Sequence, residues 1–370
     1  MANPFEKFLA FSKLAFWKRK NDSVLGIDVG TSSIKVIQLR REHGAVILET
    51  YGEIATGPYR DLSVGQVAVL SAEQQAEVLT DLFKESNVTT NQISFAIPLG
   101  SSLLISIEIP KVDEAALAKV VPIEARKYIP VPISEVALDW WVVPRKQINP
   151  EEENSKMEVL VVAIHNSTVN QYQALGQALK LTPAFLEIET FSAMRSSFTG
   201  DMSSTAIIDL GAGTTKMVIV DYGIVKLSHT IGKGSQDITI AVSRSLGIDF
   251  AKAEEIKRQV GLVERLESGQ DISSSISSIL EYIFTEVSKV ITDFQTKNKK
   301  VVNKVILIGG GALLKGVADL ANKQLSIPVV VGKPFEKVEA PAFLEGVLTE
   351  AGPAFAVSIG LALRHLQSLE

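Results

Sequence analysis

The chain of 370 residues contains the same local pattern twice, and this repeat limits the possible folds more than any other feature. In 206–220, AIIDLGAGTTKMVIV runs from an apolar segment through a glycine-rich turn into a second apolar segment, which predicts a strand, a turn and a returning strand. In 24–54 the sequence predicts the same meander, and each copy continues into a third strand. The copies lie about half a chain apart, which indicates a duplicated domain rather than a solenoid. The matching positions are Asp28 and Asp209, Gly30 and Gly211, Ser32 and Ser33 with Gly213 and Thr214, and Lys35 and Lys216.

The turn in the second copy has the chemistry of an anion site. Gly211 and Gly213 flank Ala212 and let the backbone turn tightly, so several N–H groups can point into one concave surface. This surface suits phosphate, whereas the carboxylate of Asp209 would repel it. A cation must therefore lie between them, and Mg²⁺ held through water fits best. Glycine turns also occur in ordinary hairpins, so the prediction rests on the matching copy.

Composition narrows the classes of function. The chain has no Cys, which excludes disulfides, thiol catalysis and cysteine zinc sites. Its four His residues are far apart and show no metal-ligand spacing. The net charge of −5 argues against a nucleic-acid partner. No apolar run approaches the length of a membrane span, and 46% hydrophobic residues are typical of a soluble globular protein.

The N-terminal segment 1–23 combines aromatic side chains with a basic cluster at 18–20. The basic residues follow the apolar part, unlike the order in a signal peptide. As a helix, the segment could lie on an anionic membrane surface or dock on a partner. The alternatives are a helix packed on its own domain or a frayed tail.

The rest of the chain predicts alternating strands and helices. We expect a tail (1–23), a first domain (24–99 and 164–202) around an inserted subdomain (100–163), a second domain (203–232 and 301–353) around a helical insertion (233–300), and a closing helix (354–370) that packs back on the first domain. Helices are predicted at 71–86, 113–128, 172–180, 189–198, 235–246, 250–260, 274–297 and 354–366. Further strands are predicted at 92–98, 103–109, 137–143, 157–164, 184–188, 301–308 and 329–331, with a polar hairpin tip at 147–156.

A third glycine site lies in 305–316, VILIGGGALLKG, where a buried strand leads through three glycines into a helix predicted from Ala312. A helix N-terminus and bare backbone suit a phosphate or a nucleoside. The site could be a degenerate dinucleotide fingerprint, but no acidic residue follows on a second strand. The chain has no Walker-A pattern, so a nucleotide site must use the other glycine segments.

Together, GIDVGTSSIKV, IIDLGAGTTKMV and VILIGGGALLKG resemble, in order and spacing, the phosphate-1, phosphate-2 and adenosine motifs of the superfamily of actin, chaperone ATPases and sugar kinases. Within it, the chain most resembles the PilM family of type IV pilus assembly, and next its relative FtsA. The most diagnostic segment for the PilM resemblance is IEIPKVDEAALAKVVPIEARKYIPVPISEVALDW. The resemblance implies an α/β actin-like ATPase fold, with two duplicated RNase H-like domains, each with an insertion, and a nucleotide cleft between them.

The resemblance also implies ATP and Mg²⁺ as cofactors and assigns roles to residues. Asp28 and Asp209 would hold hydrated Mg²⁺ across the cleft, and Glu254 and Lys257 would touch ribose or base. The sequence alone, without the family resemblance, indicates that Glu254 and Lys257 form an ordinary i,i+3 ion pair on a helix surface. The phosphate contacts would be Gly30, Thr31, Ser32, Ser33 and Lys35 on one side and Gly211, Gly213, Thr214 and Thr215 on the other, with Gly309, Gly310, Gly311 and Leu313 around the adenosine.

Glu189 lies where relatives carry a Glu-Pro-x-Ala signature that positions the attacking water. Thr190 replaces the proline and Ser192 the alanine. This departure predicts slow turnover at most, while ATP binding can persist without efficient hydrolysis.

The resemblance implies a non-catalytic assembly adaptor of a type IV pilus or of a related type II secretion system. Its partner would be the N-terminal cytoplasmic tail of a PilN-like membrane protein, and the chain would be cytoplasmic and peripheral at the inner membrane. A pilus assembly ATPase and a second copy of the chain are further expected partners. One alternative is an FtsA-like division protein, although the chain stops at Glu370 without that family's membrane helix. Another is a small-molecule kinase, for which Asp61, Asp113 or Asp139 would have to act as base.

Overall fold

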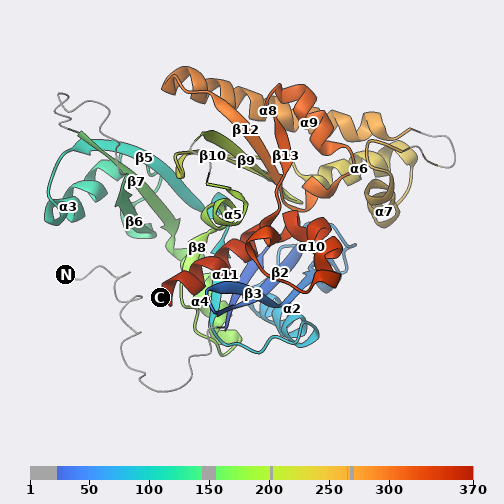
Figure 1. Cartoon of the computed structure of the whole chain (residues 1–370), viewed down its shortest axis with the longest axis horizontal. Coiled ribbons are helices and arrows are strands. Elements are labelled where there is room, and N and C mark those ends of the chain that lie inside the picture. Colours follow the sequence, from blue (N-terminus) through green and yellow to red (C-terminus); the bar gives the residue numbers. More distant parts are fainter. Residues whose placement is uncertain (1–22, 144–155, 201–202, 265, 267–270, 370) are drawn as a thin grey trace.

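The computed structural model describes residues 23–143, 156–200, 203–264, 266 and 271–369 (Figure 1). The predicted N-terminal helix and most of the hairpin tip at 147–156 lie outside these residues. Two five-stranded sheets form the body of the protein, and a three-stranded sheet lies to one side of them. The α/β architecture predicted from the repeat is confirmed, whereas the domain boundaries stay predictions.

The two larger sheets have the same topology. Three antiparallel strands are followed, on the other side of the first strand, by two parallel ones. The first sheet has the order β3-β2-β1-β4-β8, and the second β11-β10-β9-β12-β13. Their strands are β1 (Ser23–Val29), β2 (Ser33–Glu42), β3 (Ala45–Ala55), β4 (Ile93–Ile97) and β8 (Leu186–Ile188), and β9 (Ser204–Leu210), β10 (Thr215–Asp221), β11 (Ile224–Ile231), β12 (Val302–Ile308) and β13 (Val329–Val331).

The third sheet belongs to the inserted segment and is antiparallel, with the order β5-β7-β6. Its strands are β5 (Ser102–Pro110), β6 (Val136–Val142) and β7 (Lys156–His165), and α3 (Glu114–Ala125) packs on β5. The remaining helices are α2 (Ala72–Glu85), α4 (Asn166–Ala178), α5 (Glu189–Ser197), α6 (Ser235–Leu246), α7 (Phe250–Val260), α8 (Ser273–Asn298), α9 (Val317–Leu325), α10 (Glu345–Ala351) and α11 (Ala356–Ser368).

Local sequence signals explain several helix ends. Ser71 and Gln74 form a reciprocal capping box at the start of α2. Asp113 caps α3 by accepting a hydrogen bond from the backbone of Ala116. Gly247 ends α6 in the left-handed conformation, with φ of 66°. These signals place the predicted helix ends within a few residues of the observed ones.

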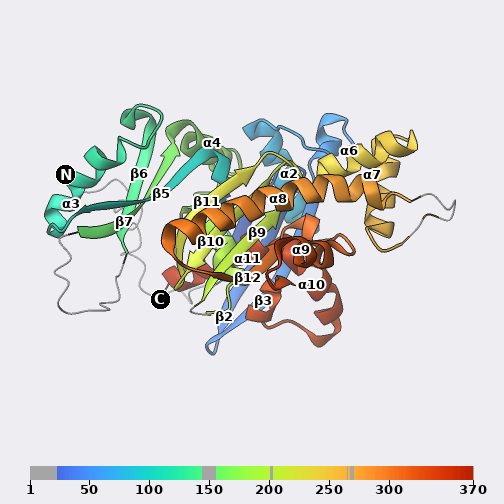
Figure 2. The ribbon, with the colours of Figure 1, turned by 90° about the horizontal axis from the view of Figure 1, so that it is seen from above.

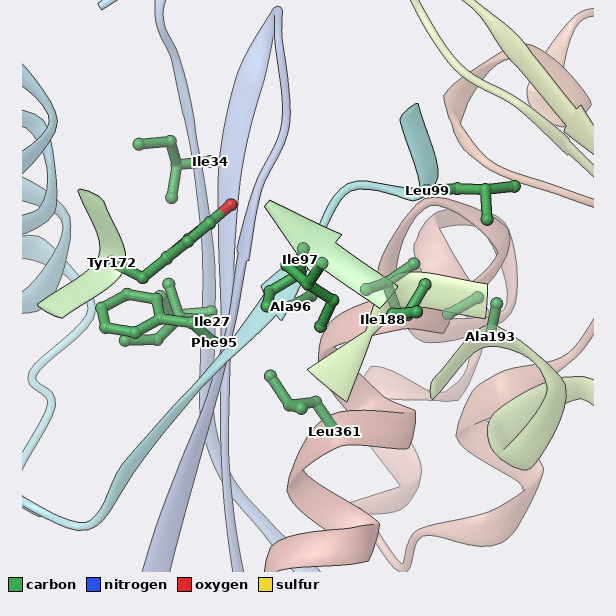
Figure 3. Packing of buried hydrophobic residues seen from close by; sticks show 14 of the residues in the cluster. Ile27, Ile34, Phe95, Ala96, Ile97, Leu99, Tyr172, Ile188, Ala193 and Leu361 are labelled. Carbon is green, nitrogen blue, oxygen red and sulfur yellow. The ribbon is translucent and has the colours of Figure 1, made fainter. Parts of the chain in front are cut away.

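The first sheet is covered on both faces. On one face, Ile27 and Phe95 pack with Tyr172 of α4, and the Phe95 and Tyr172 ring centroids lie 5.4 Å apart (Figure 3). On the other face lies α11, whose close approach needs a small residue in β1. A Cβ at Gly26 would lie 2.2 Å from the carbonyl oxygen of Ser358. The last helix of the chain therefore packs on the first sheet.

In the second half, α8 runs across the face of the sheet, as Figure 2 shows from above. Its buried positions recur at helical spacing and include Leu280, Phe284, Val287 and Ile291. They pack with apolar side chains of β9, β10 and β12 in one cluster. This core holds the second sheet rigidly beside the turn that follows β9.

Several features differ from the sequence prediction. The helix predicted at 172–180 is α4, which begins six residues earlier, at Asn166. A helix does not begin at Ala312: a 3-10 helix covers Gly310–Leu313, and α9 starts at Val317, because Gly316 has φ of 82° and interrupts the helical path. The helix α10 was not predicted.

The structure differs here from the prediction that no apolar run approaches the length of a membrane span. The helical stretch Ala342–Ser368, which contains α10 and α11, is long enough to cross a membrane, and its most apolar 18-residue window has a mean hydropathy of 1.5. Of its most apolar window, 67% is buried in the protein, as in the core helix of a globular domain.

Candidate functional site

A cavity of about 600 Å³ lies between the two halves, at the turns that follow β1, β9 and β12. This volume is within the range of sites for small molecules and cofactors. The structure brings nearly all predicted site residues to its wall. They are Asp28, Gly30, Thr31, Ser32, Ser33, Lys35, Glu189, Asp209, Gly211, Gly213, Thr214, Glu254, Lys257, Gly309, Gly310, Gly311 and Leu313.

Thr215 is the exception among the predicted phosphate contacts. Its side chain is fully buried, and its hydroxyl donates a hydrogen bond of 2.8 Å to the carbonyl oxygen of Lys233. It is the first residue of β10, where successive side chains face opposite sides of the sheet. Lys216 lines the cavity, so the Thr215 side chain points away from it.

The turn that follows β1 and the turn that follows β9 face each other. A Cβ at Gly213 would lie 3.5 Å from Thr31 Oγ1. Within each turn the glycine is needed for space, because a Cβ at Gly30 would lie 2.6 Å from the carbonyl oxygen of Ser33, and one at Gly211 2.8 Å from that of Thr214. Tight backbone turns on both walls leave a narrow space for an anion between them.

An aspartate and a lysine are cross-strand neighbours in each half. Asp28 is opposite Lys35, and Asp209 is opposite Lys216. Lys35 donates a hydrogen bond of 2.7 Å to Ser33 and also pairs with Glu53 at 3.2 Å. The repeat therefore places two carboxylates and two ammonium groups in one cavity.

Burial dominates the electrostatics of the two aspartates. It raises the pKa of Asp28 to about 6, although the charge of Lys35 opposes this shift. Burial also raises the pKa of Asp209 against the charge of Lys216. Buried carboxylates of this kind would be stabilised by a cation. Among the described residues, no group of three or more His, Cys, Asp or Glu side chains could hold a metal ion directly. The two aspartates fit a cation bound through its water molecules.

Glu189 lines the cavity, but both of its carboxylate oxygens are engaged. Oε1 accepts a hydrogen bond of 2.6 Å from the backbone N–H of Leu99, and Oε2 accepts one of 2.7 Å from Lys216. The side chain is only 7% exposed. In this arrangement each Glu189 oxygen already accepts one hydrogen bond from the protein and keeps acceptor capacity for one more.

The third glycine site touches the second aspartate. Gly309 has φ of 83°, and a Cβ there would lie 2.2 Å from Asp209 Oδ1. A Cβ at Gly311 would lie 2.6 Å from Ser235 Oγ. The glycines thus allow the backbone after β12 to pass close to the carboxylate and leave the cavity open beside it.

The predicted pair Glu254 and Lys257 is buried on α7 with 2.7 Å between Lys257 Nζ and Glu254 Oε2. Glu254 also accepts a hydrogen bond of 2.5 Å from Thr239. Burial alone would raise the pKa of Glu254, but Lys257 and its other partners hold that pKa below its usual value. A Cβ at Gly65 would lie 3.0 Å from Glu254 Oε1, so a loop of the first half reaches α7.

Sequence reasoning missed several residues on the cavity wall. Lys216 is the most informative, because its match to Lys35 in the repeat could have identified it. Ser235 and Arg258 come from the helical insertion, and Ala354 and Val357 come from the start of the closing helix. These four carry no local sequence signal, since only the tertiary fold brings them to the cavity.

Comparisons with known proteins agree with this architecture. Residues 26–366 match the family described as type IV pilus assembly protein PilM. A solved PilM–PilN type IV pilus biogenesis complex has a TM-score of 0.78 and 25% identity, over 93% of this chain and 98% of that chain. The cell division protein FtsA of Neisseria meningitidis serogroup B is 24% identical over 376 residues, or 90% of this chain and 88% of FtsA. MreB5 of Spiroplasma citri bound to ADP shares the fold, with a TM-score of 0.50 and 12% identity over 92% of this chain and 95% of that chain.

The predicted actin-like fold is thus confirmed. Because the family match covers all three glycine sites, the inserted sheet and most of the closing helix, the chain belongs to the PilM family of type IV pilus assembly proteins.

Proposed function

We propose that this protein is an ATP-binding adaptor of the type IV pilus inner-membrane assembly complex and that it binds the cytoplasmic tail of a PilN-like membrane protein. The observation that carries the proposal is the similarity to the PilM–PilN complex, which extends over 93% of this chain. A protein with this role would be cytoplasmic and peripheral at the inner membrane.

The cavity supports the nucleotide part of the proposal. Thr31 and Ser32 on one turn, and Gly213 and Thr214 on the other, would bind the phosphates through backbone N–H groups and hydroxyls. Gly309–Gly311 would leave room for the adenosine. MreB5, which shares the fold, is bound to ADP in its solved structure.

The acidic groups support a bound cation. Asp28 and Asp209 would hold the water shell of Mg²⁺, whose charge would offset that of the phosphates. Lys35 and Lys216 supply further positive charge at the same wall. Their ion pairs with Glu53 and Glu189 fix where those charges lie.

The engagement of Glu189 favours binding over hydrolysis. A residue that orients the attacking water needs a free acceptor facing it. Here each oxygen already accepts one protein donor, the Leu99 N–H or Lys216, which leaves the carboxylate less acceptor capacity for a water molecule. We therefore assign ATP a structural role, in which it holds the two halves in one orientation and hydrolysis is slow.

The inserted sheet supports the partner site. Its strand β6 is an edge strand, with no strand paired to its outer edge among the described residues. Trp141 of β6 packs edge-to-face on Phe191 of α5 with 5.3 Å between ring centroids, so the sheet adjoins the first domain. Trp141 and Val142 each stay 38% exposed. We place the tail at the inserted segment 100–163 and the adjoining face of the first domain.

A binding measurement tests both parts of the proposal. Isothermal titration calorimetry of the full chain should show binding of Mg-ATP, and then binding of a synthetic peptide of a PilN-like cytoplasmic tail to the Mg-ATP complex. A scrambled peptide is the control. Absence of tail binding with Mg-ATP present would refute the adaptor role.

A further inference from the structure

The inserted sheet is tied to the second half of the protein by a well-formed ion pair. Lys226 of β11 lies 2.8 and 2.9 Å from the two carboxylate oxygens of Glu158 on β7. Ser106 of β5 donates a hydrogen bond of 2.6 Å to the same carboxylate. Strands β5 and β11 also contact each other, and Figure 2 shows them near one another. Two sheets that belong to different halves of the chain are therefore joined here.

This pair differs from an ordinary surface ion pair. Both side chains of the Lys226–Glu158 pair are only 19% exposed. In the same inserted sheet, Lys156 and Glu108 lie 3.8 Å apart, and their side chains are 63% and 56% exposed. Exposed ion pairs contribute little to stability because water screens their charges. The Lys226–Glu158 pair is shielded and has two hydrogen bonds, so it fixes the position of β11 relative to β7. The exposed pair is thus a matched control for the shielded one.

The strand that carries Lys226 leads back to the nucleotide cavity. β11 pairs with β10 along its length, and β10 begins directly after the turn that contains Gly213 and Thr214. Lys216, near the start of β10, binds Glu189. Glu189 in turn accepts the N–H of Leu99, in the short segment that leads into the inserted sheet. The hairpin β10–β11 therefore connects the phosphate turn to the inserted sheet at two places.

We propose that the Lys226–Glu158 ion pair transmits the nucleotide state of the cavity to the inserted sheet, so that ATP strengthens binding of the partner tail. The inference rests on the proposed function. When the turn before β10 closes on phosphate, the hairpin shifts as a unit, and the ion pair carries the inserted sheet with it. By linkage, the tail strengthens ATP binding by the same factor.

The test measures tail affinity with and without ATP in matched variants. For the wild-type chain, calorimetry with the tail peptide should show about tenfold tighter binding with Mg-ATP than without nucleotide. In Lys226→Met, this ratio should fall below about twofold, while the affinity for Mg-ATP without peptide stays unchanged. Lys156→Gln, which breaks the exposed pair, should keep the full ratio. The double variant Glu158→Lys with Lys226→Glu restores the pair in reverse and should recover most of the ratio.

The outcomes separate this inference from the proposed function. A wild-type chain that binds neither Mg-ATP nor the tail would refute the proposed function. A wild-type chain that binds the tail equally well with and without ATP would overturn only the inference. A Lys226→Met variant that keeps the tenfold ratio would also overturn it. If Lys226→Met loses all tail binding but the charge-reversed double variant binds with the wild-type ratio, the ion pair itself is confirmed as the connection.

Discussion

Replacement of Asp28 by Asn tests two linked statements: the buried carboxylate of Asp28 binds a cation together with ATP, and in the absence of that ligand it lowers the free energy of unfolding. The substitution preserves shape and removes the charge. Burial raises the pKa of Asp28 from 3.8 to about 6, so the folded state disfavours the ionised carboxylate when no ligand is bound. The Asn variant should therefore be more stable than the wild-type chain at neutral pH, and weaker in Mg-ATP binding.

The size of the stability effect follows from the pKa. Well below pH 3.8 the carboxyl is protonated in both the folded and unfolded states, and the residue contributes nothing to pH dependence. Well above pH 6 it is ionised in both, and a pKa of about 6 in place of 3.8 lowers the free energy of unfolding by at most about 3 kcal/mol. Removing that cost in Asp28→Asn should raise the melting temperature by about 4 °C for a chain of this length.

The assay is thermal unfolding of both proteins without nucleotide at pH 7.5 and pH 4, followed by Mg-ATP calorimetry. The gain in melting temperature should be present at pH 7.5 and small at pH 4. Affinity for Mg-ATP should fall about 10- to 100-fold, as for residues that hold a metal through its outer shell. Asp61→Asn, at an exposed position, is the control and should change neither quantity. A variant that melts below the wild type at pH 7.5, or binds Mg-ATP equally well, would refute the reasoning.

Three further substitutions have outcomes that the structure specifies. Gly309→Ala forces a side chain into a left-handed conformation and against Asp209, so Mg-ATP affinity should fall about tenfold or more by calorimetry; unchanged affinity would contradict the close approach. Glu189→Gln should change the rate of phosphate release from ATP by less than about threefold, whereas loss of a true catalytic base costs 10²- to 10⁴-fold. Gly360→Ala would place a Cβ 1.8 Å from the carbonyl oxygen of Ser192 and should lower unfolding stability by about 3 kcal/mol in a denaturant titration; a loss below about 1 kcal/mol would mean that the helices separate easily.

The repeat made much of this fold predictable from the sequence. Strand–turn–strand patterns and helix caps are local, and residues such as Ser71 and Gly247 act on their own helix. The glycine segments could be assigned to one site because their order matched a known superfamily. The helix predicted from Ala312 was wrong because three glycines and the positive φ of Gly316 outweigh the apolar pattern that follows them.

The engagement of Glu189 could not be predicted, because its partners depend on tertiary structure. Leu99 and Lys216 are far from it in the sequence, and neither carries a motif that points to Glu189. The sequence departures at Thr190 and Ser192 predict slow hydrolysis, and this stays a prediction. The structure adds a different physical reason, which is that the carboxylate already has two donors.

The crossing of α5 and α11 links the two halves of the molecule beside the cavity. Both helices connect the two halves, and the start of each lines the cavity. Glu187, next to α5, is buried and binds Arg195 at 2.7 and 2.8 Å and Arg364 of α11 at 2.7 Å. Gly360 packs against the backbone of Ser192, so the crossing has no free space in which to slide. Because Lys216 of the β10–β11 hairpin binds Glu189 at the start of α5, we expect any movement of the two halves about this crossing to carry that hairpin with it.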